Sequence, residues 1–312
     1  MIPWRKRFRR ELRVRALLLL LPLLSRLPLR LAVAFGALLG FVAWYLVRRE
    51  RRLALEHLAL AFPDRDQAFR QRVGRASFVN LGRAALEVAC ADGYQPRLAR
   101  VVQLSPGDAA LLKDAHAEGR GVVFVSCHVG NWELLARRIG LEGYPCGTVA
   151  REAQDPRLTA LLDRSRQAAG VRVLWRGSPG LAKGLLRLLR QGGFVGLLID
   201  QDIDVQGHFV PFFGRPAFTP RAAGDLAVRT GAPMLFGCVH RLAPSVHRVT
   251  LRRIEVARTG DRELDSRALT AAATLAIEEE VRARPDEWVW MHRRWRTQPP
   301  VLTGVPDGSS VE

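Results

Sequence analysis

A histidine and a glutamate lie where an apolar segment gives way to a turn. Residues 122–133 read Val-Val-Phe-Val-Ser-Cys-His-Val-Gly-Asn-Trp-Glu, so His128 follows a strand-like run and Glu133 opens a helix-like one. On one continuous helix this offset would turn the two side chains apart, but from a turn the carboxylate can reach back to the imidazole. A carboxylate on one ring nitrogen leaves the other nitrogen free to take a proton from a hydroxyl. The pattern predicts a general base, His128, oriented by Glu133.

Other roles for this segment were weighed against that prediction. His128 could be a core histidine that only packs. A zinc site is not indicated, because no HExxH partner or other residue at ligand spacing accompanies it. Cys127 abuts the histidine and could be a nucleophile, but neighbours in an extended segment point to opposite faces, which favours core packing for Cys127. Ser126 lacks the Gly-x-Ser-x-Gly turn of a hydrolase nucleophile.

The elements that position His128 alternate between strand and helix from about residue 121 onward. Such alternation predicts βαβ units and an α/β fold with a mostly parallel sheet flanked by helices, and His128 falls at the carboxyl end of a strand, where such sheets bind ligands. The stretch 51–99 has helical spacing. The strand candidates are 121–126, 146–150, 171–174, 194–199, 233–240 and 246–254, and the helix candidates are 133–140, 155–169, 180–190, 220–230 and 265–283.

The N-terminal region predicts a hydrophobic helical membrane anchor. Leu31–Val47 carries no charge, ends near Trp44 and Tyr45, and is slightly shorter than the ~20 residues that cross a bilayer. Arginines flank it on both sides, which favours a cytoplasmic location for both ends and fits a hairpin dipping into the membrane or a marginal span. A secretory signal and a buried core helix are the competing interpretations. We therefore expect an anchor at 1–50, a catalytic domain at 51–300 and a flexible tail at 301–312.

Composition points to an anionic partner. The 312 residues are 48% hydrophobic, which allows a sizeable core, and the formal net charge is +18. That charge suits an anionic membrane, nucleic acid or an acidic carrier protein, but no nucleic-acid motif with interleaved aromatics appears. The four cysteines show no paired spacing, which favours a reduced, cytosol-facing domain.

Several further segments complete a resemblance to a known family. These segments are Asp200-Gln201-Asp202, 209–216, Thr219-Pro220, 230–233 and 288–295. With the string His128–Glu133, they resemble the glycerolipid/lysophospholipid acyltransferase superfamily and, within it, the lipid A biosynthesis (late) acyltransferases. The resemblance implies a single acyltransferase domain without cofactor or metal, which moves an acyl group from acyl-acyl carrier protein to a hydroxyl of a lipid A precursor. It also implies a place at the cytoplasmic face of the inner membrane.

The same resemblance implies roles for single residues. Backbone N–H groups of Gly130 and Asn131 would help to bind the oxyanion. Arg151 and Arg176 are candidates for gripping substrate, or are solvated loop arginines. The Asp200/Asp202 pair would hold an arginine or a sugar hydroxyl. Further substrate-binding candidates are Arg215, His292 and Arg293, and the tryptophans Trp288, Trp290 and Trp295 would sit at the level of the lipid headgroups.

Three alternative functions remain at this point. The acceptor could be another glycolipid, such as an inositol mannoside, or an amino-acid lipid. The donor could be acyl-CoA. The chain could also be a non-catalytic basic protein that binds membranes, although that function explains neither the His128–Glu133 turn nor the aspartate pair.

Overall fold

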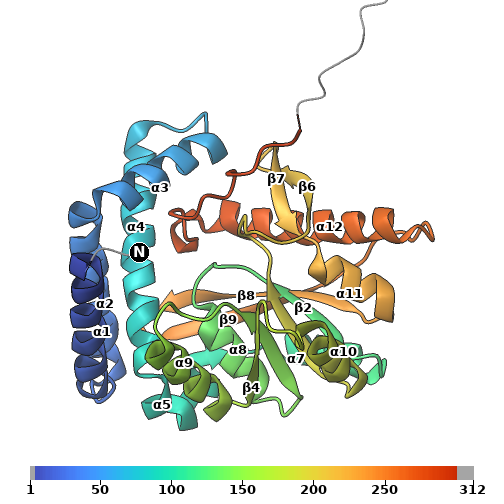
Figure 1. Ribbon diagram of the computed structural model, residues 1–312, viewed down its shortest axis with the longest axis horizontal. Helices are drawn as coiled ribbons and strands as arrows, with labels where there is room; N and C mark the ends of the chain where they lie inside the picture. The colour runs from blue at the N-terminus through green and yellow to red at the C-terminus, as the bar shows by residue number, and fades with distance from the viewer. Residues whose placement is uncertain (1–3, 301–312) are drawn as a thin grey trace, which may run out of the picture.

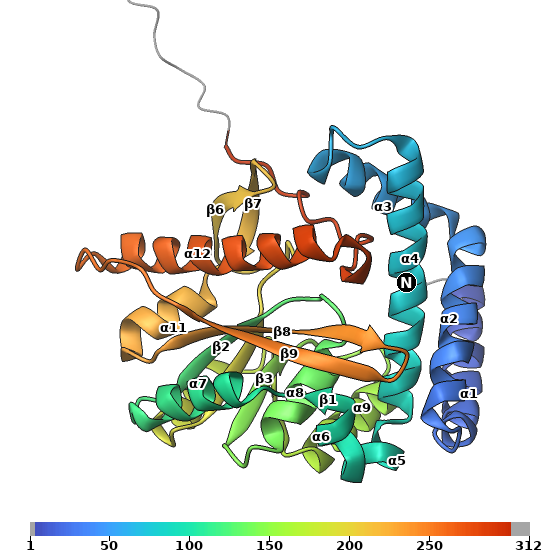
Figure 2. The ribbon, with the colours of Figure 1, turned by 180° about the vertical axis from the view of Figure 1, so that it is seen from behind.

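A mostly parallel sheet with helices on both faces forms the body of the protein (Figures 1 and 2). The computed structural model describes residues 4–300, so the predicted tail at 301–312 lies outside the described residues. Within them the main sheet has seven strands in the order β1-β9-β8-β2-β5-β3-β4, and all neighbours run parallel except β8 and β9. The predicted α/β class is confirmed.

The predicted strands all form, with ends that differ by at most a few residues. β1 and the antiparallel hairpin β6–β7 were not predicted. The strands are β1 (Val102–Gln103), β2 (Val122–Ser126), β3 (Cys146–Ala150), β4 (Val171–Trp175), β5 (Phe194–Leu198), β6 (Gly207–Phe212), β7 (Arg215–Pro220), β8 (Met234–Ala243) and β9 (Val246–Ile254).

Helices make up the rest of the described chain. Short 3-10 turns follow α5 (Gln95–Arg97) and α12 (Pro285–Glu287). The helices are α1 (Trp4–Leu24), α2 (Leu29–Leu46), α3 (Arg48–Ala61), α4 (Gln67–Ala89), α5 (Ala91–Tyr94), α6 (Leu98–Val101), α7 (Pro106–Ala117), α8 (Trp132–Gly140), α9 (Pro156–Ala168), α10 (Leu181–Arg190), α11 (Ala222–Thr230) and α12 (Arg262–Ala283).

The central strand β2 is buried on both faces, as expected for a parallel strand between two helical layers. Val123 and Val125 face a core that includes side chains of α10, α11 and α12. Val122 and Phe124 face a second core built with α7 and α8. Burial on both sides leaves the strand ends as the place where its polar residues can gather.

The N-terminal helices form an outer layer against α4, which Figures 1 and 2 show from opposite sides. α2 is long and apolar enough to cross a membrane by length and composition. Its buried residues recur about every four positions and include Gly36 and Gly40. A side chain on Gly40 would press into the backbone of Phe78, and one on Gly82 into the backbone of Gly36. The two helix backbones are therefore in direct contact.

The tryptophans near the C-terminus lie in the core instead of at a lipid surface. Trp288 and Trp290 are 1% and 0% exposed, and Trp295 is also buried. Trp288 packs on Phe212 of β6 and on Trp290. The expectation that these rings sit among lipid headgroups is wrong, because the β6–β7 hairpin and α12 enclose them.

Replacing Gly40 should test the α2–α4 contact. We expect Gly40→Ala to lower the free energy of unfolding by about 1–3 kcal/mol, because the added methyl group meets backbone that cannot move aside cheaply. Denaturant unfolding in mild detergent would measure it. The matched control is Gly107→Ala in α7, where only Ser105 Oγ lies near the added methyl group, at 3.8 Å. Equal stability of both variants would contradict the packing described.

Candidate active site

His128 and Asp200 meet at the carboxyl ends of two neighbouring strands. β2 and β5 pair in parallel with Ser126 opposite Leu198, and each candidate residue lies two positions further along. The Asp200 carboxylate accepts a hydrogen bond from Nδ1 of His128 at 2.8 Å and another from the His128 backbone N–H at 2.7 Å. The imidazole is thus oriented by Asp200. It remains 16% exposed.

Asp200 is buried and held ionised. Trp288 Nε1 donates a third hydrogen bond to its carboxylate, at 2.8 Å. Burial alone would raise the pKa of Asp200, but the attraction and hydrogen bonds of His128 and the Trp288 bond outweigh it and hold that pKa well below its usual range. A carboxylate in this state fixes the tautomer with the proton on Nδ1 and leaves Nε2 as the basic nitrogen.

The expectation that Glu133 orients the His128 imidazole is not met. Its carboxylate accepts two hydrogen bonds from Arg166 of α9, from Nε at 2.9 Å and from Nη2 at 2.5 Å. Glu133 opens α8, and its side chain is drawn sideways because a half-buried guanidinium offers a bidentate partner there. The pair ties the start of α8 to α9, and the expected orienting contact comes from Asp200 instead.

The other side of the imidazole is covered by Gln201 and His292. The Gln201 amide nitrogen lies 3.0 Å from Nε2 of His128 and 2.6 Å from Nε2 of His292. Burial, followed by the nearby His128, lowers the pKa of His292 to about 4, so this ring is neutral near pH 7. Of the predicted substrate-binding residues, His292 is therefore brought to the site. Trp132 packs edge-on to His128 with ring centroids 4.6 Å apart.

The two turn residues have structural partners. The Gly130 N–H donates to the Glu287 carbonyl at 2.9 Å, so the expected oxyanion role of Gly130 is not supported. Gly130 has a φ of 62° and lies against Val239, which explains why a glycine stands there. The Asn131 side chain caps α8 and donates to Glu87 Oε2 at 2.9 Å. The Asn131 backbone N–H stays a predicted oxyanion donor.

Glu87 anchors that turn from α4. Arg241 and His247 donate to its carboxylate, His247 at 3.0 Å. Burial raises the pKa of Glu87, but these hydrogen bonds outweigh burial and lower the pKa to about 2. A buried carboxylate needs such compensation, and here it fixes the amide of Asn131 as well.

The remaining predicted residues lie apart from the imidazole contacts. Asp202 accepts hydrogen bonds from two residues of the C-terminal segment, from Arg296 Nη2 at 3.1 Å and from the Thr297 backbone N–H at 2.6 Å. Of the two expected partners of the aspartate pair, an arginine or a sugar hydroxyl, Asp202 therefore binds an arginine. Arg176 is half-buried after β4. The structure gives no substrate contact that tests the others, which are the exposed arginines Arg151, Arg215 and Arg293.

An apolar pocket begins beside the imidazole. Trp132 and Ser126 line the pocket near His128, and it continues between α8 and the face of the sheet that carries Phe124, Gly196 and Val171. Apart from Ser126 and Thr148, its lining side chains are hydrocarbon, aromatic or thiol groups, or glycine. The lining of this pocket suits hydrocarbon better than sugar.

Comparison with known proteins identifies the family of the chain. A family model described as bacterial lipid A biosynthesis acyltransferase matches residues 4–297. The chain belongs to this family. It is 27% identical over 288 residues to the lipid A biosynthesis lauroyltransferase of Escherichia coli K12, covering 91% of this chain and 90% of the relative. It is 26% identical over 281 residues to the palmitoleoyltransferase of the same organism, covering 88% of each chain. A phosphatidylinositol mannoside acyltransferase of Mycobacterium tuberculosis (strain CDC 1551 / Oshkosh) is 30% identical over 141 residues, 45% of each chain.

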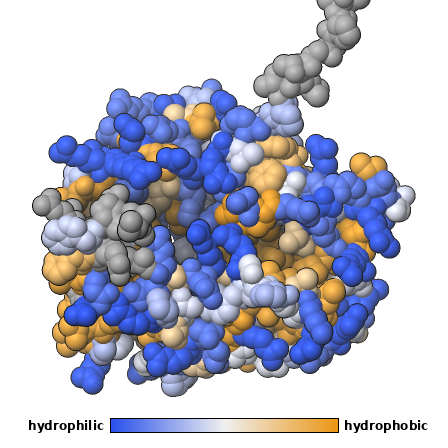
Figure 3. Space-filling view, viewed as in Figure 1, coloured by the Kyte–Doolittle hydropathy of each residue, from blue (hydrophilic) through white to orange (hydrophobic). Residues whose placement is uncertain are grey.

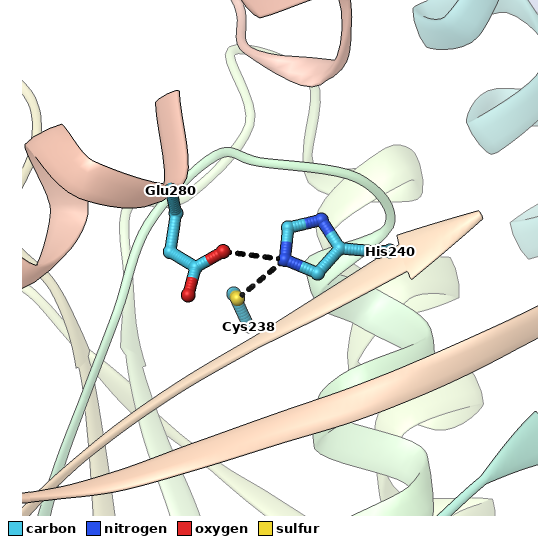
Figure 4. A group of neighbouring side chains, drawn as sticks. All are labelled: Cys238, His240 and Glu280. Atoms are coloured by element: carbon cyan, nitrogen blue, oxygen red, sulfur yellow. Dashed lines mark hydrogen bonds and ion pairs between the residues drawn. The ribbon is translucent and has the colours of Figure 1, made fainter. Parts of the chain in front are cut away.

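This acyltransferase also carries a group of buried titratable side chains between β8 and α12 (Figure 4). Cys238 and His240 point from β8 toward Glu280 of α12, and their potential ligand atoms lie within 4.8 Å of one another. His240 Nε2 lies 2.7 Å from Glu280 and 3.2 Å from Cys238 Sγ. Burial lowers the pKa of His240, but the contacts with Cys238, Glu280 and Glu287 outweigh it and raise the pKa to about 11. We interpret the contact between the His240 ring and the Glu280 carboxylate as an ion pair.

Some of these residues were missed from the sequence. Arg166 and Trp288 carry no local signal for their roles, and Gln201 was quoted only as part of the resemblance. Asp200 was expected to hold an arginine or a sugar hydroxyl, not the imidazole. One signal for its role was present, because Asp200 follows its strand at the same distance as His128 follows β2.

The raised pKa of His240 predicts a pH-dependent stability. Its unfolded pKa is about 6.5, so the stabilisation is fully present below pH 6.5 and declines as the pH rises toward 11. We expect the difference in unfolding free energy between the wild type and His240→Gln to shrink over that range, measured by denaturant unfolding. His116→Gln serves as control, because the His116 ring contacts the Gly192 carbonyl and not a carboxylate. A pH-independent difference for His240→Gln would contradict the ion pair.

Proposed function

We propose that this acyltransferase moves a fatty acyl group from acyl-acyl carrier protein to a hydroxyl of a lipid A precursor, at the cytoplasmic face of the inner membrane. The observation that carries the proposal is the 2.8 Å contact between His128 Nδ1 and a buried, ionised Asp200, beside an apolar pocket. The chemistry that this site supports is that of a general base, which needs an alcohol and an activated acyl group.

The direction of proton transfer follows from the tautomer of His128. Nδ1–H donates to Asp200, so Nε2 takes the proton from the acceptor hydroxyl as its oxygen attacks the thioester carbonyl. The tetrahedral oxyanion that forms is stabilised by donors such as the Asn131 backbone N–H. Its collapse breaks the carbon–sulfur bond, and the imidazolium returns the proton to the departing thiolate. Asp200 stabilises the imidazolium in between, as carboxylates do beside catalytic histidines.

Glu133 takes a positioning role in this proposal. Its ion pair with Arg166 fixes the start of α8, and Trp132 and Leu135 of that helix line the apolar pocket. The pair therefore aligns the acyl chain with the imidazole. Gln201 and His292 close the opposite side, where they can contact the acceptor once it displaces the amide from the ring.

The proposed donor and acceptor rest on charge and on the relatives. An acidic carrier protein suits a chain with a net charge of +18, and opposite charge speeds such encounters at low salt. The lipid A enzymes match about nine-tenths of the chain, whereas the inositol mannoside enzyme matches under half. Acyl-CoA as donor and an inositol mannoside as acceptor are the alternatives. An acyl-transfer assay with each donor and each acceptor would separate them.

Substitutions at the two site residues should separate base from orienter. We expect His128→Ala to lower kcat/KM for acyl transfer by ~10²- to 10⁴-fold, the usual contribution of a general base. Asp200→Asn should lower kcat and also move the pH–rate profile, because the imidazole loses its ionised partner. Glu133→Gln should lower activity without moving that profile, since the Glu133 charge is already paired with the Arg166 guanidinium. The measurement is acyl transfer from acyl-carrier donors to a lipid A precursor.

Cys127→Ala is the control for this series. The thiol is buried, and burial raises its pKa well above the ordinary value, so we expect the variant to keep most of the activity. Loss of transfer in Cys127→Ala at wild-type stability, or wild-type rates in His128→Ala, would overturn the proposed mechanism.

The apolar pocket should set the length of the acyl chain. A side chain on Gly196 would enter the pocket, where its nearest neighbours are Gly147 O at 3.4 Å and Thr148 Oγ1 at 3.6 Å. We expect Gly196→Val to shift the preferred donor to shorter chains, measured by competition among carrier-bound acyl groups of graded length. Gly180→Val, in open space before α10, should leave the preference unchanged. An unchanged preference in Gly196→Val would exclude this pocket as the acyl site.

A further inference from the structure

The exposed apolar surface of the described residues is concentrated on α1, α2 and the residue after α2. Fifteen large hydrophobic side chains within residues 4–47 are exposed, against five in the remainder of the described chain. On α2 they include Leu31, Phe35, Leu38 and Val42, which turn away from α4. Apolar side chains are visible along the left edge of Figure 3, where Figure 1 places α1 and α2. A soluble surface rarely carries so large an apolar area.

α2 cannot separate from α4 without breaking the backbone contact at Gly40 and Gly82. α4 belongs to the catalytic domain, because Asn80 donates to the Asp286 carbonyl at 2.8 Å and Glu87 binds Arg241. α4 also carries Arg72, Arg75 and Arg83 along its length. If α2 crossed a bilayer in this arrangement, those arginines would enter the hydrocarbon, which is energetically costly.

α1 lies on the same side as the catalytic domain. Arg157 of α9 donates two hydrogen bonds to Glu11 of α1, from Nη1 at 3.0 Å and from Nη2 at 2.7 Å. A chain that crossed the membrane once through α2 would place Glu11 and Arg157 on opposite faces. Arg26 lies before α2, Arg30 is its second residue, and Arg48 follows it after Val47, so neither end of α2 favours the periplasmic side.

We infer that α1 and α2 form an in-plane membrane anchor that enters one leaflet of an anionic bilayer and does not cross it. The outward apolar faces of both helices lie in the acyl boundary, and the arginines that follow α2 contact lipid phosphates. Trp44 is covered by Phe78, and the guanidinium of Arg51 lies over its ring at 5.8 Å, which places this arginine beside the end of the anchor. The occupant of the exposed face is thus a lipid surface.

The anchor is linked to the active site through α3. α3 follows α2 after one residue, and His57 Nδ1 of α3 lies 2.9 Å from the Trp290 carbonyl, two residues before His292. The in-plane anchor therefore sets the position of the catalytic turn relative to the headgroups. This inference deepens the proposed membrane localisation and does not depend on the catalytic assignment.

Cysteine labelling in cells distinguishes an in-plane anchor from a span. The four natural cysteines are buried, so single cysteines introduced at Arg26, before α2, and at Asp64, after α3, can be read with a membrane-impermeant maleimide. We expect both Arg26→Cys and Asp64→Cys to react in inverted inner-membrane vesicles and neither to react in spheroplasts. Reaction of Arg26→Cys from the periplasmic side would overturn the inference, because it would place the start of α2 across the membrane from the catalytic domain.

Depth measurements test the lipid contact itself. We expect an environment-sensitive fluorophore on Leu38→Cys to be quenched by brominated lipids in vesicles of phosphatidylethanolamine and phosphatidylglycerol. The same fluorophore on Leu275→Cys, an exposed leucine of α12, is the matched control and should not be quenched. Leu38→Glu should weaken vesicle binding severalfold while acyl transfer to a detergent-dispersed acceptor persists. Absence of quenching at position 38, or unchanged vesicle binding by Leu38→Glu, would overturn the lipid contact without touching the catalytic proposal.

Discussion

The pairing register of two parallel strands determines the chemistry of this protein. Ser126 of β2 stands opposite Leu198 of β5, so the chain delivers His128 and Asp200 side by side at the edge where both strands end. A shift of one residue would turn one of the two side chains toward the other face of the sheet. The hydrogen bond from Nδ1 to the carboxylate, and with it the basicity of Nε2, follows from the sheet before any loop contributes.

The segment that follows α12 supports both His128 and Asp200. Glu287 accepts the Gly130 N–H through its carbonyl, and its carboxylate accepts the Arg241 N–H at 3.2 Å. The next residue, Trp288, donates to Asp200. One short turn after α12 therefore supports both the loop that carries His128 and the carboxylate that orients it. This explains why a tryptophan-rich ending is buried instead of lipid-exposed.

Local patterns were sufficient to predict six strands of the main sheet, most helices and the position of His128, because each depends on neighbours in sequence. The partner of His128 depends on the order of the strands in the sheet. β5 lies beside β2, although β3 and β4 come between them in sequence, because these two strands lie on the far side of β5. No local pattern encodes that order. The Glu133–Arg166 pair was missed for the same reason, since its partners are 33 residues apart. The β6–β7 hairpin was missed because Pro211 and Pro216 pair opposite each other in a two-stranded sheet with no further strand.

The two carboxylates near the imidazole illustrate why proximity in sequence is a poor guide to role. A carboxylate that orients a catalytic histidine must stay ionised in a buried place, which requires several fixed donors. Asp200 has three, from the His128 ring, the His128 backbone and Trp288. Glu133 has a full guanidinium as partner, so its charge is already neutralised and adds little to an imidazolium. Asp200 is therefore arranged to orient the imidazole, whereas Glu133 fixes the start of the helix that lines the apolar pocket.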